Sequence, residues 1–389
     1  MKFTEYVEVN PKTNLKKGEY APFVEMANVS ITYREPEKIE YKKYTSGPKF
    51  QNGDSVVARI EPCLQNGKRF FWKSDKIGFG STEYIVFRAK EGKMDSKYLF
   101  YLLKTDYIKK SMVSSMVGST GRQRVNNDIF GQIEIVVPNI EKQKKIGKTL
   151  FLYDDLIENN QKQIKLLEEA AQRLYKEWFV DLRFPGHENT KIVDGVPEGW
   201  NVYPFSSKVD IMSGGTPKTS IPDYYNGKIP FYTPKDSDGA FFAYKTQMNI
   251  TEGGLKNCNS RLYPPKTVII TARGTVGKTI ILAVPMAMNQ SCYALKMKEN
   301  DAPYYLFFAL NNEIKALQTM ANGGVFNTII GKTFDSINIQ IPKDPLIYGF
   351  EETVRPFMEQ IKNKLQANSK LVEARDRLLP KLMSGEVEV

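Results

Sequence analysis

The chain of 389 residues contains two copies of one long unit, and this duplication limits its possible folds more than any other feature. Residues 122–138 match residues 326–342 at a constant offset of 204, and both segments end in a proline. The match continues without a gap, so that 167–174 corresponds to 371–378. A repeat this long indicates duplication of a whole domain rather than a solenoid.

Further upstream the two copies match more loosely. The paired segments are Lys97–Leu103 with Tyr304–Leu310, Val56–Arg59 with Ile270–Arg273, and Pro22–Phe23 with Pro230–Phe231. In each copy, runs that alternate apolar and polar residues, 132–137 and 336–341, predict β-strands. Glycine, proline and asparagine clusters between such runs predict loops.

A long helix is expected to follow the mixed part of each copy. Between Ile146 and Trp178 apolar residues recur at alternating spacings of four and three, as in a coiled coil, and Asn160 is the polar exception. These 33 residues would span about 50 Å as a helix. Adding the offset to this series gives a second seam that Lys364, Asn368 and Arg375 interrupt, which predicts a wetter middle.

Two seams in one chain favour an antiparallel pair with an approximate two-fold axis, in which Asn160 would set the register. Packing of the first helix on its own domain is the alternative. Pro356 is expected to break or kink the first turns of the second helix. The residues expected at the helix-pair interface are Ile146, Leu150, Ile157, Asn160, Ile164, Leu167, Leu174, Trp178, Val354, Phe357, Ile361, Leu371, Leu378 and Leu382.

The sequence therefore predicts an α+β protein with two α/β domains joined by two long helices. The expected boundaries are 1–140 for the first domain, 141–182 for the central helix, 183–195 for a linker, 196–345 for the second domain and 346–389 for the C-terminal helix. The helix length would suit two DNA half-sites about 34 Å apart, which is one turn of the duplex.

The net charge of +11 lies on the globular parts. Residues 1–140 carry +7 and residues 196–345 carry +4, whereas both helical segments are neutral. Because phosphate binding needs lysine and arginine, the two domains are the candidate DNA surfaces and the neutral helices suit protein contacts.

Arginine, lysine, asparagine and glutamine are the side chains that best read base edges and phosphates. Those that fall in polar loops are our candidate DNA-binding residues, although a solvated loop explains the first-copy segment Gly118–Asn127 equally well. Phe70, Phe71 and Trp72, beside one of these clusters, are expected in the core. The candidates are Arg59, Lys68, Arg69, Arg122, Gln123, Arg124 and Asn127 in the first copy, and Thr216, Lys218, Lys235, Arg273, Lys278 and Asn327 in the second.

Little in the sequence points to catalysis. The three cysteines form no CxxC pair and there is one histidine, so we expect no metal site, disulfide framework or cofactor. Residues 272–279 nearly match a phosphate-binding loop, but Ala272 stands where that motif needs glycine, and a tight turn presenting Arg273 and Lys278 is favoured. No membrane span or secretory signal is expected, so we expect a cytoplasmic protein.

Four short motifs resemble the specificity subunits of type I restriction–modification systems. They are Leu174-Tyr-Lys-Glu-Trp-Phe-Val-Asp-Leu182, Leu378-Leu-Pro-Lys-Leu-Met-Ser-Gly-Glu386, Val196-Pro-Glu-Gly-Trp200 and Gly214-Gly-Thr-Pro-Lys218. The strand–proline–helix junction at Val137–Ile146 is similar too. The resemblance extends over nearly the whole chain.

The resemblance implies two target recognition domains that each read one half of a split, asymmetric DNA site. It also implies an antiparallel coiled coil that sets the spacing and docks two methyltransferase subunits, with motor–nuclease subunits joining the full complex. The chain itself would be non-catalytic. Because Phe326 stands at the position of Arg122, the two domains are expected to read different sequences.

One departure from the family pattern and two rival functions remain at this stage. The first copy starts directly at Met1–Phe3, without the Gly-Trp element of the second, so its first strand is expected to be shortened. The rivals are a self-contained DNA methyltransferase or nuclease and a coiled-coil scaffold that binds no DNA. Leu262–Lys266 lacks the acidic or amide residue of an amino-methyltransferase motif, which argues against the first rival.

Overall fold

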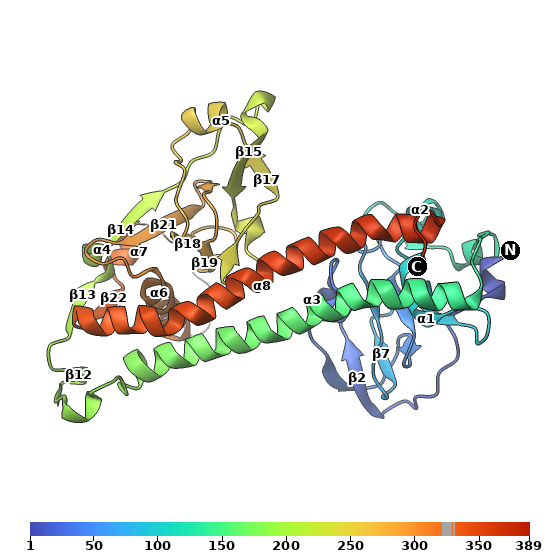
Figure 1. Cartoon of the computed structure of the whole chain (residues 1–389), viewed down its shortest axis with the longest axis horizontal. Coiled ribbons are helices and arrows are strands. Elements are labelled where there is room, and N and C mark those ends of the chain that lie inside the picture. Colours follow the sequence, from blue (N-terminus) through green and yellow to red (C-terminus); the bar gives the residue numbers. More distant parts are fainter. Residues whose placement is uncertain (321–328, 330) are drawn as a thin grey trace. The chain divides into compact units, whose positions relative to one another are not determined.

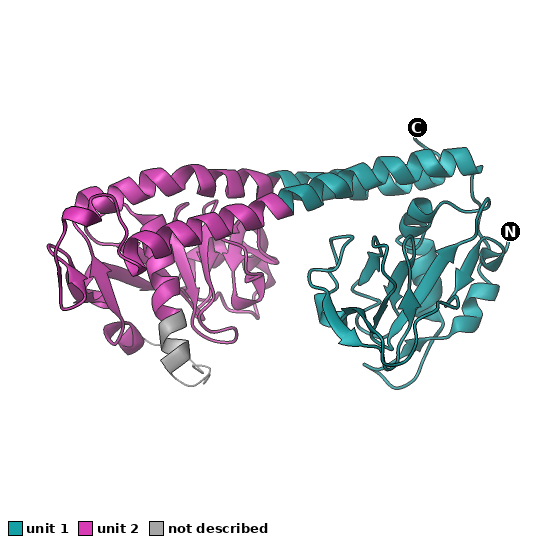
Figure 2. Cartoon of the chain, turned by 90° about the horizontal axis from the view of Figure 1, so that it is seen from below, with its two compact units in different colours: residues 1–161, 367–389 teal, residues 162–366 magenta. Residues whose placement is uncertain are grey.

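The computed structural model describes residues 1–320, 329 and 331–389, and within them the chain forms two compact units (Figure 1). Unit 1 consists of residues 1–161 and 367–389, and unit 2 of residues 162–366. Each unit therefore includes part of both long helices, α3 (Ile140–Tyr175) and α8 (Asp344–Ser384), as the two colours in Figure 2 show. The predicted tandem organisation and mixed α/β content are confirmed.

Unit 1 contains two four-stranded sheets. The central sheet has the order β1-β8-β5-β6 and is antiparallel throughout, and the outer sheet has the order β3-β2-β7-β4 with β2 and β7 parallel. The strands are β1 (Val7–Val9), β2 (Tyr20–Val24), β3 (Glu40–Lys43), β4 (Lys49–Phe50), β5 (Ser55–Ala58), β6 (Arg69–Phe71), β7 (Gly78–Gly80) and β8 (Tyr84–Ala89). A hairpin of β9 (Met116–Val117) and β10 (Arg124–Val125) and the helices α1 (Ser96–Leu102) and α2 (Asp106–Ser114) complete it.

The central sheet of unit 1 separates two hydrophobic cores. Alternate side chains along a strand point to opposite faces, and β5 places Val57 on one face and Val56 on the other. Val57 packs with residues of α1 and α3, whereas Val56 packs with Phe70 and Trp72. Phe70 and Trp72 are buried, as is Phe71, so the prediction that these aromatics belong to the core is confirmed.

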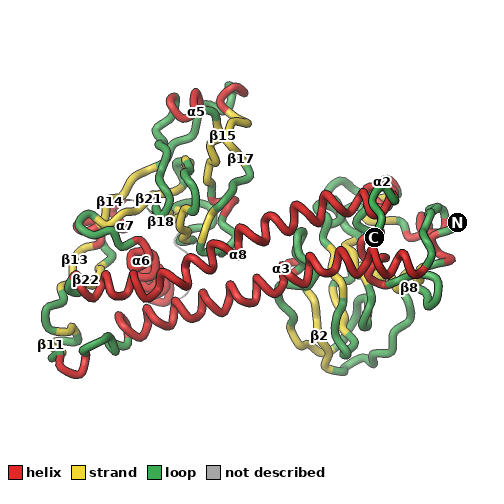
Figure 3. The backbone as a smooth tube through the Cα atoms, viewed as in Figure 1, coloured by secondary structure: helices red, strands yellow, loops and turns green. Residues whose placement is uncertain are grey.

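Unit 2 repeats this plan with additions. Its central sheet has the order β14-β21-β18-β19-β16 and its outer sheet the order β17-β15-β20, in which β15 and β20 are parallel. The strands are β14 (Val209–Ser213), β15 (Tyr225–Tyr232), β16 (Phe242–Ala243), β17 (Met248–Ile250), β18 (Val268–Thr271), β19 (Thr279–Leu282), β20 (Ala287–Met288) and β21 (Cys292–Met297). Short pairs join β11 (Ile192–Val193) to β12 (Val196–Pro197) and β13 (Asn201–Pro204) to β22 (Asn338–Ile341). The helices are α4 (Phe205–Lys208), α5 (Glu252–Lys256), α6 (Pro303–Met320) and α7 (Gly331–Asp335), and Figure 3 shows the helices and strands along the backbone.

The shared topology fixes how the two copies correspond. Pro22–Phe23 and Pro230–Phe231 lie on β2 and β15, which occupy the same place in the two outer sheets. The predicted alignment of Val56–Arg59 with Ile270–Arg273 is shifted by one residue. Ala58 is the last residue of β5 that pairs with β8, and its counterpart is Thr271, the last residue of β18 that pairs with β21. The backbone N–H of residue 59 donates to Glu83 O, just as that of residue 272 donates to Ser291 O.

The predicted strand at 132–137 is also corrected. This segment forms an isolated bridge between Glu134 and Lys2, whereas β22 in the second copy pairs with β13 over four residues. The difference arises because the partner segment turns into a 3-10 helix at Phe3–Glu5 after a single pairing residue.

Both long helices pack into the cores of the units through which they pass. In unit 1, Ile146 and Leu150 of α3 share a core with Leu379 and Leu382 of α8. In unit 2, Ile164 lies in a core with Val354 and Ile361, and Leu167, Leu174, Trp178 and Phe357 pack at its edge. Ile157 is buried, Leu371 and Leu378 are half-buried, and Met358 is buried where the predicted seam has Phe357.

The expected break in the second helix does not occur. Helix α8 is continuous from Asp344 to Ser384 and passes through Pro356, so the prediction that this residue breaks the helix is wrong.

None of the helices in the described residues combines the length and apolar character of a membrane span.

Two of the three polar residues of the second seam, Asn368 and Arg375, are buried rather than hydrated as predicted, whereas Lys364 is half-buried. Asn368 and Arg375 are 4% and 2% exposed. The Asn160 side-chain amide donates to Asn368 Oδ1 over 2.8 Å, and Arg375 forms an ion pair with Asp154. Both contacts join α3 to α8, and their order shows that the two helices run antiparallel within unit 1.

A loop of unit 1 joins the same charged cluster. Arg34, whose side chain is fully buried, donates to Asp155 Oδ1 over 2.8 Å and forms an ion pair with Glu158. Arg375 Nη1 also donates to the backbone oxygen of Thr32. Burial raises the pKa of Glu158 to about 7, although Arg34 opposes this shift. These contacts tie the loop around Arg34 to both long helices.

Removing Arg375 should strongly destabilise unit 1. Arg375→Ala leaves the Asp154 carboxylate buried without its cation, which typically costs about 3–5 kcal/mol of unfolding free energy. Replacing both residues by leucine should be less harmful than the single change, because no unpaired buried charge remains. The measurement is urea unfolding followed by circular dichroism.

Arg377 provides the matched control, because it pairs with Glu373 on the same helix but its side chain is 79% exposed. Arg377→Ala should change the unfolding free energy by less than about 1 kcal/mol. Equal effects of the two alanine variants would contradict a special role for the buried pair.

Candidate nucleic-acid interface

The loop between β18 and β19 is the sharpest feature of unit 2. Gly274 and Gly277 both have φ of +81°, a left-handed conformation that glycine adopts without strain. Arg273 and Lys278 in this loop are exposed, as predicted for a tight turn. The element that follows is a strand rather than a helix, so the segment lacks the helix N-terminus on which a P-loop holds phosphate.

A second turn lies against this loop. Thr275 donates its hydroxyl to the backbone oxygen of Pro234, over 3.3 Å. The 3-10 turn Pro234–Asp236 is fixed by Asp236, whose carboxylate accepts from both the N–H and the hydroxyl of Thr233. The exposed Lys235 therefore lies in a rigid turn beside the Arg273 loop.

The Gly-Gly-Thr-Pro-Lys segment, residues 214–218, packs at the end of the central sheet of unit 2, where Gly214 N–H donates to Cys292 O. A Cβ on Gly214 would lie 2.2 Å from Asn289 O, and one on Gly215 would lie 2.6 Å from Asn259 N. Only glycine permits such close backbone approach. The segment then presents Thr216, whose hydroxyl contacts the side chain of Gln290, and the exposed Lys218.

Backbone hydrogen bonds join these loops into one group, which we call the unit 2 loop cluster: residues 214–218, 233–237, 272–278 and 288–291. Asn289 N–H donates to Tyr232 O, and Ala272 N–H donates to Ser291 O. The structure thus brings together Thr216, Lys218, Lys235, Arg273 and Lys278, while Asn327 lies outside the described residues. Sequence reasoning missed Gln290, which no motif marks.

The first copy builds a related group, the unit 1 loop cluster: residues 59–61, 81–83 and 118–127. Arg59 Nη2 and Val125 O form a 3.1 Å hydrogen bond, and Gly121 N–H donates to the Glu61 carboxylate. Arg122 and Asn127 are exposed, and the Gln123 amide donates to Gly118 O.

Arg124 is already occupied within this cluster. Its guanidinium makes three hydrogen bonds of 2.8 to 3.0 Å to the Glu83 carboxylate, which raises the pKa of Arg124. A DNA phosphate would have to compete with Glu83 for this side chain.

Two candidate residues point elsewhere. The Lys68 ammonium donates to Met26 O over 2.7 Å. Arg69 donates to Gly67 O and Leu103 O, and burial near Arg375 lowers its pKa to about 10. We therefore place Arg69 in the buried charged cluster of unit 1 rather than at a DNA surface. The spacing in the sequence could not show this, because the partner residues lie far along the chain.

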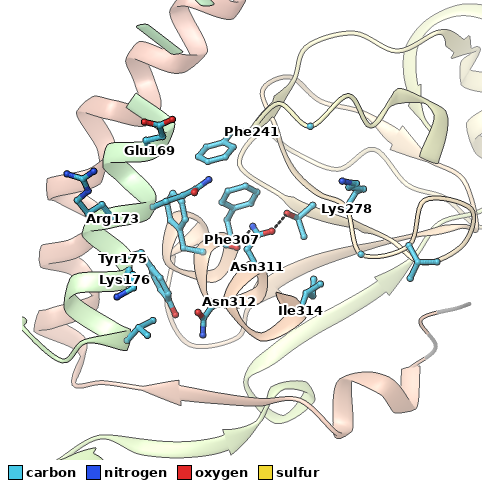
Figure 4. Close-up of a pocket in the computed structure, with 17 residues that line it drawn as sticks. Glu169, Arg173, Tyr175, Lys176, Phe241, Lys278, Phe307, Asn311, Asn312 and Ile314 are labelled. Atoms are coloured by element: carbon cyan, nitrogen blue, oxygen red, sulfur yellow. Dashed lines mark hydrogen bonds between the residues drawn. The ribbon is translucent and has the colours of Figure 1, made fainter. Parts of the chain in front are cut away.

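A pocket of about 770 Å³ lies beside the Arg273 loop in unit 2 (Figure 4). It is bounded by Arg173 at the end of α3, by Lys176 in the helical turn that follows, by residues 276–279 and by α6. Asn311 in its wall is held by Thr279, whose hydroxyl contacts the Asn311 carbonyl at 2.7 Å. Among the described residues that line the pocket, Glu169 is the one acidic side chain, so these residues provide no pair of carboxylates for acid–base chemistry. Within the described residues, no group of three or more metal-ligating side chains converges.

The matches to known proteins fall on the two units. The family model described as "Type I restriction modification DNA specificity domain" matches twice, at residues 7–169 and 197–366. The chain belongs to this family. The predicted resemblance is thereby confirmed.

Named relatives extend along most of the chain. The MjaIX specificity subunit of Methanocaldococcus jannaschii is 29% identical over 302 residues, which cover 76% of this chain and 69% of that protein. The HindI specificity subunit of Haemophilus influenzae is 25% identical over 404 residues, covering 87% of each chain. The crystal structure of the S subunit from M. genitalium superposes with a TM-score of 0.59 at 16% identity, over 98% of this chain and 95% of that one, and thus shares its fold.

Gly214→Ala should disable the unit 2 loop cluster. The added Cβ would meet Asn289 O at 2.2 Å, so the backbone must shift, at a cost of about 1–3 kcal/mol. We expect a lower unfolding free energy and weaker binding to duplex DNA in a gel-shift titration.

Gly253→Ala in α5 is the control, since its Cβ would make ordinary contacts with Thr251 Oγ1 at 3.6 Å and Tyr224 Cδ1 at 4.0 Å. This variant should keep both stability and DNA affinity. If Gly214→Ala bound DNA as tightly as Gly253→Ala, the unit 2 loop cluster would not be a DNA surface.

Proposed function

We propose that this chain is the sequence-specific DNA-binding subunit of a type I restriction–modification complex. The observation that carries this proposal is that the family model matches each copy separately, and each copy holds one cluster of polar, basic loops. Two separate readers in one chain suit a bipartite, asymmetric DNA site, with one half-site for each loop cluster.

The residues of each loop cluster have different roles, which follow from the chemistry of their side chains. Arg122, Gln123 and Asn127 in the first copy can donate to base edges or phosphates, and Arg273 and Lys278 do so in the second. Arg59 is half-buried and supports the hairpin through Val125 O, so it acts as a positioning residue. The two copies differ at these positions, and we infer that they read different half-sites.

The long helices serve as a spacer in this proposal. An antiparallel coiled coil of α3 and α8 would hold the two readers apart, with the Asn160–Asn368 pair setting the register. Contacts of both helices with the core of each unit support this arrangement. We retain the domain boundaries at 1–140, 141–182, 183–195, 196–345 and 346–389 as part of the proposal.

The catalytic work belongs to partner proteins. Two methyltransferase subunits would dock on the chain and modify adenine, and motor–nuclease subunits would join to cleave DNA. A self-contained methyltransferase or nuclease is disfavoured, because the family model matched by both copies is a DNA specificity domain. The neutral surface of the helices suits such protein partners better than DNA.

Methylation mapping tests the recognition role. In cells that carry this chain with its methyltransferase partner, we expect a two-part methylated site. Arg122→Ala should relax only one half of it and Arg273→Ala only the other, each at a cost of about 1–3 kcal/mol if the residue reads a base. Methylation by the purified chain alone, or equal binding to all duplexes with the partner present, would overturn the proposal.

Heptad insertion tests the spacer. Seven residues inserted after Gln161 and after Gln366 should lengthen both helices by about 10 Å. The gap between half-sites should then grow by about three base pairs at 3.4 Å each, while both half-site sequences stay the same. The insertion in one helix alone is the control and should abolish recognition of a regular site. A lengthened pair with an unchanged gap would refute the spacer.

A further inference from the structure

The outer sheet of unit 1 has a face that its counterpart in unit 2 does not expose. In unit 2, Phe231 of β15 is fully buried and packs with Ile250 and Ala287. Leu255 of α5 packs against these residues, so that a helix covers this side of the sheet. The equivalent strand of unit 1 carries Phe23, which belongs to neither hydrophobic core of that unit.

Lysines take the place of the helix in unit 1. Phe23, Phe79 and Tyr44 form an aromatic cluster, with ring centroids 5.0 and 5.2 Å apart for the two contacts to Phe79. The Lys42 ammonium lies 4.3 Å from the centre of the Phe23 ring, and the Lys49 ammonium lies 4.9 Å from that of Tyr44. We call these five residues the basic–aromatic face: Phe79 at its centre is buried, Phe23, Tyr44 and Lys49 are half-buried, and Lys42 is exposed.

The edge of the same sheet adds to this charge. Lys43 lies over the ring of Tyr20 and Lys76 over that of Tyr41, and both tyrosines are more than half exposed. Glu40 is the acidic residue on β3, and it is shared by Lys38 and Lys42, which lower its pKa to about 2. The strands of this sheet therefore carry more lysines than acidic residues.

The basic–aromatic face continues directly into the unit 1 loop cluster. Gly47 has a φ of +105°, and a Cβ there would lie 2.2 Å from Gly80 O, so the segment between Tyr44 and Lys49 packs closely on the end of β7. Strand β7 leads from Phe79 into residues 81–83, where Glu83 holds Arg124. A duplex seated on the loop cluster could thus extend its phosphate backbone along the sheet.

We propose that the basic–aromatic face binds the DNA backbone and adds to the first unit a sequence-independent contact from a surface that α5 covers in the second unit. The proposal rests on the proposed function and deepens it. Ammonium groups on short strands suit phosphate contacts, and phosphate contacts raise affinity without selecting a sequence. Because α5 covers the matching face of unit 2, the asymmetry is built into the duplicated fold.

The test is a salt titration of DNA binding by the full chain with its methyltransferase partner. The variant is Lys42→Gln with Lys49→Gln, and the probes are a duplex with the mapped site and one without it. Two lost phosphate contacts should reduce the slope of log K against log salt by about 1.8. Affinity should fall by the same factor for both duplexes, so the specificity ratio and the mapped methylation site stay unchanged.

Lys165→Gln with Lys370→Gln removes the same charge from the two helices and should leave the slope unchanged. An unaltered slope in the Lys42 and Lys49 variant would overturn the proposal, as would an altered half-site or a loss of partner association with intact DNA binding. The last result would assign this face to a protein. Failure of the proposed function itself would look different, because the unmodified complex would then show no two-part site.

Discussion

The whole structure depends on two helices, α3 and α8, because each of them contributes to the hydrophobic core of both units. α3 and α8 are amphipathic along their whole length, and neither unit has a complete core without a stretch of each. The buried apolar residues of α8 begin with Ile347 in the core of unit 2 and end with Leu382 in the core of unit 1. Each duplicated domain thus completes its core with a stretch of both helices.

Polar groups set the register within this apolar frame. A purely hydrophobic seam permits sliding by a heptad, whereas Asn160 with Asn368 and Asp154 with Arg375 are satisfied in one alignment. Arg34 extends the same network from a loop of the first domain to Glu158. The buried ion pairs therefore orient the first domain on the helices more than they stabilise the fold, since their desolvation offsets much of their attraction.

Much of this organisation could be predicted from the sequence, and the exceptions have physical causes. The repeat predicted two α/β units, and the spacing of apolar residues predicted both long helices. The strand at 132–137 did not form because a ladder needs a partner that stays extended, and the chain turns at Phe3. Pro356 did not end α8, because packing of Val354 and Met358 in the core outweighs one lost backbone hydrogen bond. Tertiary context decided both outcomes.

The candidate site was harder to predict for the same reason. Loops were identified correctly by glycine and polar residues, and Arg273 and Lys278 are exposed as expected. Arg69 had the same features in the sequence as these two residues, but its guanidinium donates a hydrogen bond to Leu103 O and points into unit 1. The basic–aromatic face escaped notice because its residues are spread from Phe23 to Phe79 and meet only when β2 and β7 pair.

The discontinuity of unit 1 also has a consequence during synthesis. Its first 161 residues leave the ribosome long before residues 367–389, which supply Leu379, Leu382 and Arg375. Until then Asp154 has no arginine opposite it, and the apolar side of α3 that α8 will cover stays open. Unit 2 is contiguous and can close first, so the domain made first is the last to be completed.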